Sequence, residues 1–513
     1  MSTVWNEGYF TDVAYTYGYY REINPVFQRF CLLLRGFAAP DAAQQQHCEL
    51  GFGQGVSINI HAAASPDSFV GTDFNPAHAA HANQLAAISG SGARLFDDSF
   101  EQLLARTDLP QFDSISLHGI WTWVSRDNQK IIAEFARRHL KPGGLLYISY
   151  NCFPGWSPAY PLRQLFALHD RFIPGATGAV QRVEAAMKFS EGLLAAQPNY
   201  LKAVPHLPER LKKIMEQNRH YLAHEYFNRE WNCMYFTDVV DALSPAKLDF
   251  ACTAAPLDAV ESVNLSPDAQ TFLGSIGHPI LREQARDYFV NQQFRKDLYV
   301  RGPIRLPPVL RHQQLLQTRF VLQQHAADVP LKVAAAAGEA TLQEAVYRPV
   351  LDALASNQYA PKTLRELVAA LPALQEVQVL EALTVLVGTS AAAPCQSEAA
   401  ARQVHKRCDA LNRHLIERAQ FSNDVEVLAS PVLGGGVPVR RFQQLFLLAR
   451  AQGRKNAQEW AQHAWRIIEA QGQRIIKEGK TLESPDDNLA ELTRQANEFA
   501  EKGVPLLKAL QVA

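Results

Sequence analysis

A short glycine-rich stretch carries the clearest chemical signal in this chain of 513 residues. Glu49 is followed by Gly51, Gly53 and Gly55, with one residue between each pair. Glycines at this spacing permit a tight turn with positive φ, and they let the backbone approach a bulky ligand closely. A carboxylate beside them would repel a pyrophosphate and attract a cation. The stretch therefore predicts a turn beneath a nucleoside that carries positive charge.

A second carboxylate follows where a doubly wound sheet holds a ribose. Residues 68–73 form a short apolar run that ends in Asp73, and Phe74 comes next. An acidic residue at this point of the fold binds ribose hydroxyls. A dinucleotide site would instead require the spacing Gly-x-Gly-x-x-Gly, which is absent here. S-adenosylmethionine carries a sulfonium and an ammonium and no phosphate, so it fits Glu49 and the glycine spacing better.

The elements that must position these residues are the strands of a parallel sheet. Residues 93–100 predict a third strand, residues 112–117 a fourth, and residues 140–150 a helix end, a Pro-Gly-Gly turn and a buried fifth strand. Five strands that alternate with helices give a right-handed α/β fold. The third strand ends in side chains able to surround an adenine: Asp97, Asp98, Ser99 and Phe100.

Aromatic and polar residues follow the fourth and fifth strands, where open α/β sheets bind ligands. Trp121 and Trp123 come after the fourth strand, and Tyr150 and Asn151 end the fifth. Aromatic walls guide an ammonium group by cation–π attraction, and His118 could remove the proton of an amine before it attacks. Core packing has equal weight for both tryptophans, because large aromatic side chains dominate protein cores.

Taken together, these motifs resemble the class I S-adenosylmethionine-dependent methyltransferases. Residues 17–25, 117–125 and 149–156 are similar, more narrowly, to bacterial methyltransferases that carry a methyltransferase regulatory domain. That group includes protein-lysine methyltransferases that modify outer-membrane proteins of obligate intracellular bacteria. The resemblance is specific over residues 1–170 and recognisable to about residue 305. It implies a Rossmann-like sheet, S-adenosylmethionine as the methyl donor, and in-line attack of a substrate nucleophile on the sulfonium methyl.

Three bodies are expected along the chain. Residues 1–170 form the S-adenosylmethionine-binding domain, residues 171–310 a helical regulatory or dimerisation-type domain, and residues 311–513 a mainly helical C-terminal domain. Long helices are predicted at residues 179–195 and 208–226. Residues 361–387 predict two short helices joined by a turn, which is typical of a winged-helix-like module. The second helix offers no Lys or Arg to a phosphate or guanine, so we expect no nucleic-acid binding.

Composition limits the cellular location and the kinds of partner more than it limits the reaction. A formal net charge of −1 gives no reason to expect nucleic acid or an anionic membrane as partner. Seven cysteines without a Cys-x-x-Cys pair fit a reducing compartment. No signal-peptide pattern is visible, and no apolar run approaches the roughly 18 residues that span a bilayer. We therefore expect a cytoplasmic protein that does not enter a membrane.

Three smaller features have competing interpretations. His61, His78 and His81 suggest a zinc site by their spacing, but no motif supplies further ligands, so no metal is expected. Residues 282–311 hold seven Lys or Arg and three acidic residues. We expect these cations to lie on a solvated helix face and to pair with acids elsewhere in the chain, rather than to form a docking surface for an acidic partner. The glycine run at residues 433–438 predicts a turn.

The sequence allows more than one class of methyl acceptor. The helical extension is about twice as long as the sheet domain, which favours a protein or other macromolecule. A small-molecule or glycan methyltransferase and a catalytically idle S-adenosylmethionine-binding scaffold are the alternatives. The extra helices could form a homodimer interface or pack within one chain. Residues 15–20 could cover the donor as a lid or pack as an N-terminal arm.

Overall fold

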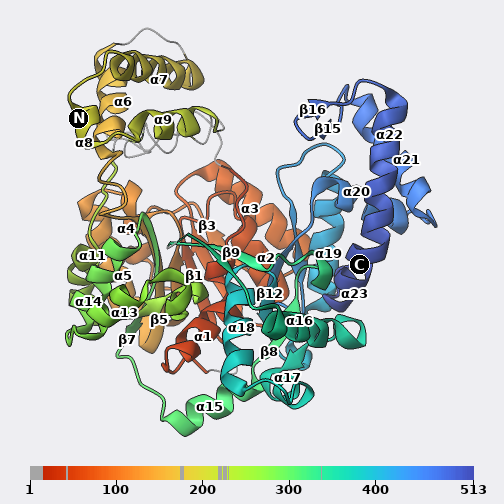
Figure 1. Cartoon of the computed structure of the whole chain (residues 1–513), viewed down its shortest axis with the longest axis horizontal. Coiled ribbons are helices and arrows are strands. Elements are labelled where there is room, and N and C mark those ends of the chain that lie inside the picture. Colours follow the sequence, from red (N-terminus) through yellow and green to blue (C-terminus); the bar gives the residue numbers. More distant parts are fainter. Residues whose placement is uncertain are drawn as a thin grey trace.

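The centre of the molecule is a seven-stranded sheet (Figure 1). The computed structural model describes residues 16–513 except 42–43, 174–177, 218–221, 223–227, 229 and 337. The strand order is β3-β2-β1-β4-β5-β7-β6, in which β1 to β5 are parallel and β7 is antiparallel to both β5 and β6. The strands are β1 (Gln46–Leu50), β2 (Ser68–Thr72), β3 (Arg94–Phe96), β4 (Phe112–Leu117), β5 (Leu140–Asn151), β6 (Leu248–Thr253) and β7 (Phe294–Arg301).

The five predicted strands are confirmed, and the sheet has two more. Both additional strands come from residues 171–310, which were expected to be helical, so the sheet continues past the predicted boundary at residue 170. Their pattern was hidden because Arg295 and Asp297, charged residues of β7, are buried and paired with each other. The predicted Pro-Gly-Gly turn appears as a shift in the β4–β5 register.

Helices cover both faces of the sheet. One face packs against α4 (Phe100–Ala105), α5 (Arg126–His139) and α11 (Phe236–Leu243), and the other against α1 (Pro25–Leu34), α2 (Val56–Ala64) and α3 (Pro76–Ser89). The local sequence explains where several of these helices begin. Asn24 accepts hydrogen bonds from the N–H groups of Val26 and Phe27 ahead of α1, and Asn75 caps α3 in the same way. Proline follows each cap at the first helical position, where its missing N–H costs nothing.

A small helical group stands apart from the sheet, at the upper left of Figure 1. It has its own hydrophobic core, in which Trp156, Phe166 and Met187 are buried. The helix predicted at residues 179–195 is confirmed, whereas the one predicted at 208–226 ends at Met215, and residues 218–221 and 223–226 lie outside the described residues. The group comprises α6 (Tyr160–Phe172), α7 (Ala179–Ala195), α8 (Tyr200–Ala203) and α9 (Leu207–Met215); α12 (Glu261–Asn264), α13 (Pro267–Gly274) and α14 (Pro279–Phe289) follow before β7.

The C-terminal half is mainly helical and includes the two predicted helices at residues 361–387, now α17 and α18. The glycine run at 433–438 forms the strand β14 as well as a turn. Helices are α15 (Pro308–Gln317), α16 (Glu344–Tyr359), α17 (Leu364–Ala370), α18 (Glu376–Gly388), α19 (Glu398–Arg418), α20 (Arg441–Ala451), α21 (Ala457–Ala470), α22 (Pro485–Glu498) and α23 (Val504–Ala509). Strands are β8 (Arg319–Leu322) between β11 (Lys362–Thr363) and β12 (Ala392–Cys395), and the pairs β9 (Lys332–Ala335) with β10 (Gly338–Thr341), β13 (Val427–Ser430) with β14 (Gly435–Pro438) and β15 (Ile476–Lys477) with β16 (Lys480–Thr481). Short 3₁₀ turns include η1 (Arg21–Ile23) and η2 (Trp121–Trp123).

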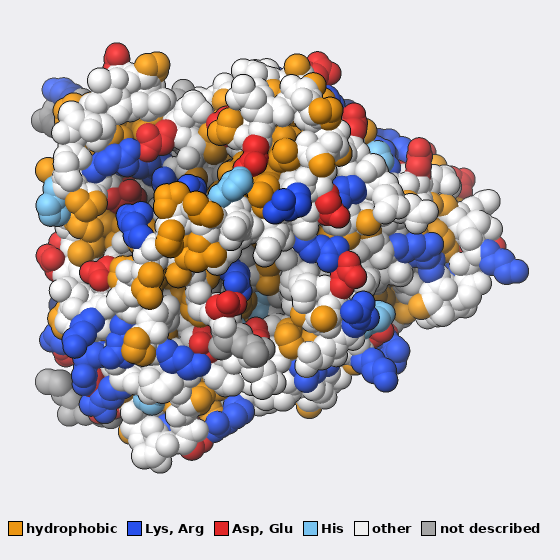
Figure 2. Space-filling model, turned by 90° about the horizontal axis from the view of Figure 1, so that it is seen from below, with side chains coloured by type: hydrophobic (Ala, Val, Ile, Leu, Met, Phe, Trp, Pro, Cys, Tyr) orange, Lys and Arg blue, Asp and Glu red, His pale blue; other side chains and the backbone are white. Residues whose placement is uncertain are grey.

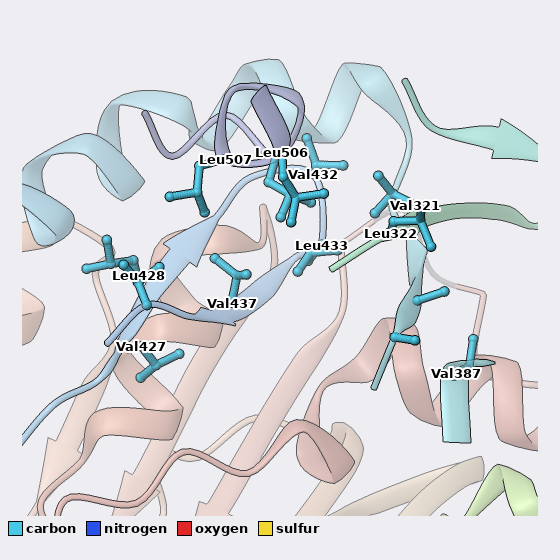
Figure 3. Close-up of a cluster of buried hydrophobic side chains, with 14 of the residues drawn as sticks. Val321, Leu322, Val387, Val427, Leu428, Val432, Leu433, Val437, Leu506 and Leu507 are labelled. Carbon is cyan, nitrogen blue, oxygen red and sulfur yellow. The ribbon is translucent and has the colours of Figure 1, made fainter. Parts of the chain in front are cut away.

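A continuous hydrophobic core joins this half to the sheet. Figure 3 shows part of it, where side chains of β8, α18, β13, β14 and α23 meet. The same cluster reaches Phe27 and Phe30 of α1 and Val56 and Ile60 of α2. Burial of this much apolar surface holds the C-terminal half and the sheet in a fixed arrangement, because each buried aliphatic or aromatic side chain contributes about 1.5–3 kcal/mol to stability. The C-terminal half is therefore packed onto the sheet rather than tethered to it.

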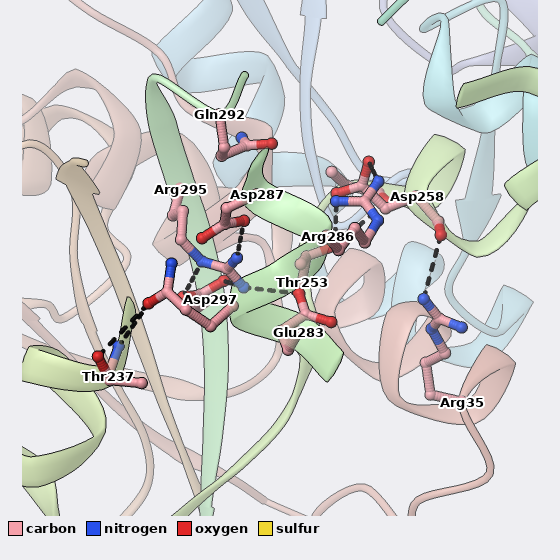
Figure 4. Close-up of polar contacts among 12 residues, drawn as sticks. Arg35, Thr237, Thr253, Asp258, Glu283, Arg286, Asp287, Gln292, Arg295 and Asp297 are labelled. Atoms are coloured by element: carbon pink, nitrogen blue, oxygen red, sulfur yellow. Dashed lines mark hydrogen bonds and ion pairs between the residues drawn. The ribbon is translucent and has the colours of Figure 1, made fainter. Parts of the chain in front are cut away.

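Among the residues that the structure describes, four of the seven cations at residues 282–311 are paired with acids, as expected, and the other three donate to backbone carbonyls. Arg295 is 2% exposed and contacts Asp287, Asp297 and Glu283 at 2.5, 2.8 and 2.8 Å (Figure 4). Arg286 reaches Asp258 at 2.7 Å. The difference from the prediction is burial, since these two arginines lie inside the protein rather than on a solvated helix face. Seen from below, the surface mixes Lys and Arg with Asp and Glu (Figure 2). No helix in the described part of the chain is long and apolar enough to span a lipid bilayer.

Candidate active site

A cavity of about 170 Å³ opens at the carboxyl ends of the parallel strands. It lies beside β1 and β4, where the strand order reverses and where α/β sheets of this kind bind ligands. Most of the predicted site residues line it. They are Glu49, Gly51, Gly53, Asp73, Phe74, Asp98, Ser99, Phe100, His118 and Trp123. Residues far apart in the sequence therefore meet at one place, as the motif spacing predicted.

The glycine turn forms the floor of this cavity. Gly51 has φ +71° and Gly53 φ +58°, in the left-handed region that favours glycine. A Cβ added at Gly51 would overlap the side chain of Ile120. The turn is held from β2, because the N–H of Gly51 donates to the carbonyl of Thr72 at 2.8 Å and that of Gly53 to Oδ2 of Asp73 at 2.8 Å.

Gly55 and Asp97 lie outside the cavity, contrary to their predicted contact with the donor. Gly55 precedes α2 with φ +73°, and a Cβ there would overlap Ala82 of α3. Its role is thus to let α2 approach α3. The side chain of Asp97 is exposed to solvent away from the cavity. Its neighbour Asp98 lines the cavity and forms an ion pair with Arg106 at 3.1 Å.

Two neighbouring carboxylates have different environments. Burial, and then the charge of Asp73, raises the pKa of Glu49 to about 8. Glu49 is therefore mainly protonated at neutral pH when no cation is nearby. Asp73 is well supplied with donors, because besides Gly53 it accepts from the N–H of Asn75 at 3.1 Å and lies 3.1 Å from Nδ1 of His78. Such hydrogen bonds fix its orientation toward the cavity.

His118 lies at the end of β4 in a buried aromatic environment. Its Nδ1 is 2.8 Å from the hydroxyl of Tyr147, and its ring stacks on Tyr20 with centroids 3.8 Å apart. Burial lowers the pKa of His118 to about 4, although Glu22 opposes that shift. The imidazole is therefore neutral near pH 7, and it is a weak base.

The segment before η1 separates the cavity from the C-terminal half. Thr16, Gly18 and Tyr20 line the cavity. The alternate residues point the other way: the Tyr19 hydroxyl accepts from the N–H of Gly436 at 2.7 Å, and Arg21 donates to the carbonyls of Val387 and Gly388 at 2.7 and 2.8 Å. This alternation is that of an extended chain. The segment therefore combines both predictions: it forms a wall of the cavity, as a lid would, and it packs against the rest of the chain as an arm. Tyr15 lies outside the described residues.

Three predicted acceptor residues lie in the core instead of the cavity. Trp121 has no exposed surface, and its Nε1 donates to Sδ of Met234 at 3.2 Å. The hydroxyl of Tyr150 donates to Asp297 at 2.7 Å, and the buried Asn151 is held through its N–H by Thr122. Of the aromatic pair, Trp123 alone lines the cavity, and it also packs against the core of α6–α9.

Several cavity residues were missed from sequence. Asn75 and His78 follow Asp73 within five residues, so the position of that carboxylate was an available signal. Glu230 had none, because long-range packing brings it in, whereas Tyr20 belongs to residues 15–20, for which a lid over the donor was one expectation. The three histidines of the zinc alternative contact other groups: His78 meets Asp73, His61 the Tyr19 hydroxyl, and His81 the carbonyl of Gln54. Within the described ranges, no His, Cys, Asp or Glu cluster suited to a metal occurs.

The charge of the cavity has one sign. Among the described residues its acidic side chains are Glu49, Asp73, Asp98 and Glu230, and no Lys or Arg lines it. Such a cavity attracts cations and repels phosphates and carboxylates. A ligand with a sulfonium and an ammonium therefore fits it.

Comparisons with known proteins agree with this geometry. A family model described as a methyltransferase domain matches residues 48–144, and one described as a predicted methyltransferase regulatory domain matches residues 218–301. The chain is 40% identical to the uncharacterized protein sll1526 of Synechocystis sp. over 99% of this chain and 100% of that protein. It is 24% identical to the uncharacterized protein RP789 of Rickettsia prowazekii over 59% of this chain and 54% of the other. Among solved structures, PKMT2 from Rickettsia typhi in complex with AdoHcy superposes with a TM-score of 0.68 at 17% identity, over 97% of this chain and 100% of that one.

Proposed function

Since this chain belongs to the class I S-adenosylmethionine-dependent methyltransferases that carry a methyltransferase regulatory domain, we propose that it methylates lysine side chains of a protein. The observation that carries the proposal is the acid-lined cavity without a Lys or Arg among its described residues. A lysine ammonium is attracted to such a site, whereas a phosphorylated or carboxylate acceptor is repelled. The likeness to PKMT2 over nearly the whole chain supports the same acceptor class.

The donor half of the site is assigned from the sheet edge. S-adenosylmethionine supplies a methyl group bound to a sulfonium centre. We assign Glu49 to its cationic amino-acid end, Asp73 to the ribose hydroxyls, and Asp98, Ser99 and Phe100 to the adenine. Gly51 and Gly53, both with positive φ, line the cavity in a tight turn, and we assign this turn to the nucleoside.

The chain contributes to methyl transfer chiefly by alignment. Methyl transfer needs little acid–base chemistry, so placing the nucleophile and excluding water supply most of the rate. Tyr20 and His118 close the cavity from the arm and from β4. With a pKa of about 4, His118 is too weak a base to take a proton from an amine whose ordinary pKa is near 10.4. The lysine therefore loses its proton to solvent, and its neutral form attacks.

The test is labelling of proteins with tritiated S-adenosylmethionine. Purified protein is incubated with bacterial lysate, and labelled proteins are digested and their methylated residues identified by mass spectrometry. Methyl-lysine supports the proposal; label confined to small molecules or glycans favours that alternative. Binding of the donor with no label in any fraction would support the idle scaffold. Asp73→Ala serves as the matched control, because weaker donor binding by calorimetry should accompany loss of label.

The setting of the reaction is part of the same proposal. We place the protein in the cytoplasm, because all seven cysteines are free thiols, as in a reducing compartment. A macromolecular acceptor remains the expected partner. The homodimer and the domain boundaries at residues 170 and 310 stay predictions.

A further inference from the structure

Glu230 is an acidic residue of the cavity to which we assign no contact with the methyl donor. The other three acids lie at or just after the ends of β1, β2 and β3, and two of them already have close partners: Asp73 in Gly53 and Asp98 in Arg106. Glu230 belongs instead to the segment between α9 and α11, beyond the helical group. It forms no ion pair with another described residue. A carboxylate thus reaches the cavity from a part of the chain that does not belong to the strand ends carrying the other three acids.

The position of Glu230 is set by Asn232. The N–H of Asn232 donates to the carbonyl of Thr122 at 2.7 Å, and its side-chain amide donates to the carbonyl of Val124 at 3.0 Å. These bonds flank Trp123, which lines the same cavity and packs against the core of α6–α9. The two hydrogen bonds of Asn232, one on each side of Trp123, therefore hold the segment that contains Glu230 next to Trp123.

A carboxylate beside an indole is a receptor for an ammonium group. The carboxylate supplies charge-assisted hydrogen bonds, and the ring attracts a cation over its face. Resting on the proposed function, we infer that Glu230 and Trp123 form the acceptor subsite that selects a primary ammonium, the lysine side chain, over neutral and anionic acceptors. Asn232 is the positioning residue of this subsite.

The subsite acts on binding rather than on proton removal. An ionised Glu230 stabilises the charged form of the amine, which is not the form that attacks. Its loss should therefore raise the acceptor KM and leave kcat unchanged or slightly higher. A merely structural role would lower kcat and donor affinity together. The split between KM and kcat separates the two explanations.

Binding of n-butylammonium tests the subsite without turnover. Protein loaded with S-adenosylhomocysteine is titrated with n-butylammonium and, as the neutral analogue, n-butanol, followed by saturation-transfer NMR. Wild type should prefer the ammonium, and Glu230→Gln should weaken its binding roughly 10- to 100-fold, as expected when a hydrogen bond to a charged group is lost. Glu191→Gln, an exposed acid on α7 that does not line the cavity, is the matched control and should bind as wild type. Glu230→Asp should recover part of the affinity.

The outcomes separate this subsite from the proposed function. Equal binding of n-butylammonium and n-butanol by wild type, or unchanged binding by Glu230→Gln, overturns the subsite even if lysates yield methyl-lysine. An ammonium preference that depends on Glu230 upholds the subsite as a cation receptor, even if the labelled acceptor is an amine other than protein lysine. With a labelled lysine acceptor in hand, an increase in KM without a fall in kcat for Glu230→Gln supports the subsite, and a fall in kcat alone overturns it.

Discussion

The hydroxyl of Tyr19 accepts a hydrogen bond from the backbone N–H of Gly436 across 417 positions of the chain. The next residue, Tyr20, stacks on His118 at the cavity. Tyr19 is buried, which raises its pKa to about 12, so the hydroxyl stays protonated and donates onward to a neighbour such as Nε2 of His61 at 3.2 Å. The C-terminal half therefore holds one wall of the donor cavity in place.

Tyr19→Phe should weaken donor binding. The substitution leaves the Gly436 N–H without its partner inside the protein, at a cost of about 1–3 kcal/mol. Part of that cost is relieved if the arm moves, which would shift Tyr20 away from His118. Calorimetry with S-adenosylmethionine should show a larger Kd, and urea denaturation should show a modest loss of stability.

Arg21→Ala should act in the same direction, because it removes the bonds to the Val387 and Gly388 carbonyls at the end of α18. Arg29→Ala is the matched control. Arg29 pairs with Asp41 on the surface, where such pairs contribute roughly 0–1 kcal/mol. Donor affinity that falls equally in both variants would mean that the arm is not the cause.

Donor binding should release a proton from Glu49. Its pKa of about 8 in the free protein means that the carboxyl is protonated at pH 7, and an approaching cation favours the ionised form. Affinity should therefore rise as the pH increases toward 8 and level off above it. Calorimetry in buffers with different heats of ionisation measures the protons released.

The donor's own amino group also titrates near pH 8, so the wild-type profile alone is ambiguous. Glu49→Gln resolves this, because the difference between the two profiles belongs to Glu49. The variant should release fewer protons and bind more weakly at pH 8 than wild type. An identical proton count in both proteins would rule out ionisation of Glu49 on binding.

The donor half of the site was predictable from sequence because its signals are local. β1 is followed at once by Gly51, β2 by Asp73, β3 by Asp97 and Asp98, and β4 by His118, and parallel strands bring those ends together. Asp97 lies outside the cavity although Asp98 lines it, since neighbouring residues of an extended segment point to opposite sides.

The remainder depends on long-range packing that no local pattern reports. β7 contains Arg295 and Asp297, so no apolar run marks it as a strand, and the pairing of these two residues is visible only in three dimensions. Glu230 reaches the cavity through bonds from Asn232 to residues more than a hundred positions away. Trp121 and Trp123 had equal weight in the sequence, and the fold places one in the core and one at the cavity.

His118→Asn should lower the rate without moving the pH profile of turnover. Asparagine can keep a hydrogen bond to Tyr147 but loses the stack with Tyr20, an aromatic pair of about 0.5–1.5 kcal/mol. Because the His118 pKa is about 4, its titration lies below the range in which the amine becomes reactive. Disappearance of an acidic limb between pH 6 and 8 in the variant would show that His118 is the base after all.

Asp287→Asn should flatten the pH dependence of stability. Burial, first, raises the pKa of Asp287 to about 7, above its value near 3.9 in an unfolded chain. A carboxyl with a raised folded-state pKa favours the folded state most at acidic pH, and this contribution is lost as pH rises through about 7. Urea denaturation from pH 5 to 8 should therefore show a shallower decline in the variant. Asp249→Asn, an exposed position on β6, should leave the decline as in wild type.

Gly51→Ala should damage the donor site for two separable reasons. The residue has φ +71°, which costs an alanine about 1–2 kcal/mol, and its Cβ would overlap Ile120. Gly51→Ala/Ile120→Ala removes the overlap and should recover part of the donor affinity, while the strain remains. Gly90→Ala measures strain alone, because Gly90 has φ +63° with open space around its Cβ position. Calorimetry measures the donor affinity of all three variants, and urea denaturation measures their stability. If Gly51→Ala loses no more stability than Gly90→Ala, and the double variant recovers no affinity, then the contact between the glycine turn and Ile120 does not shape the cavity.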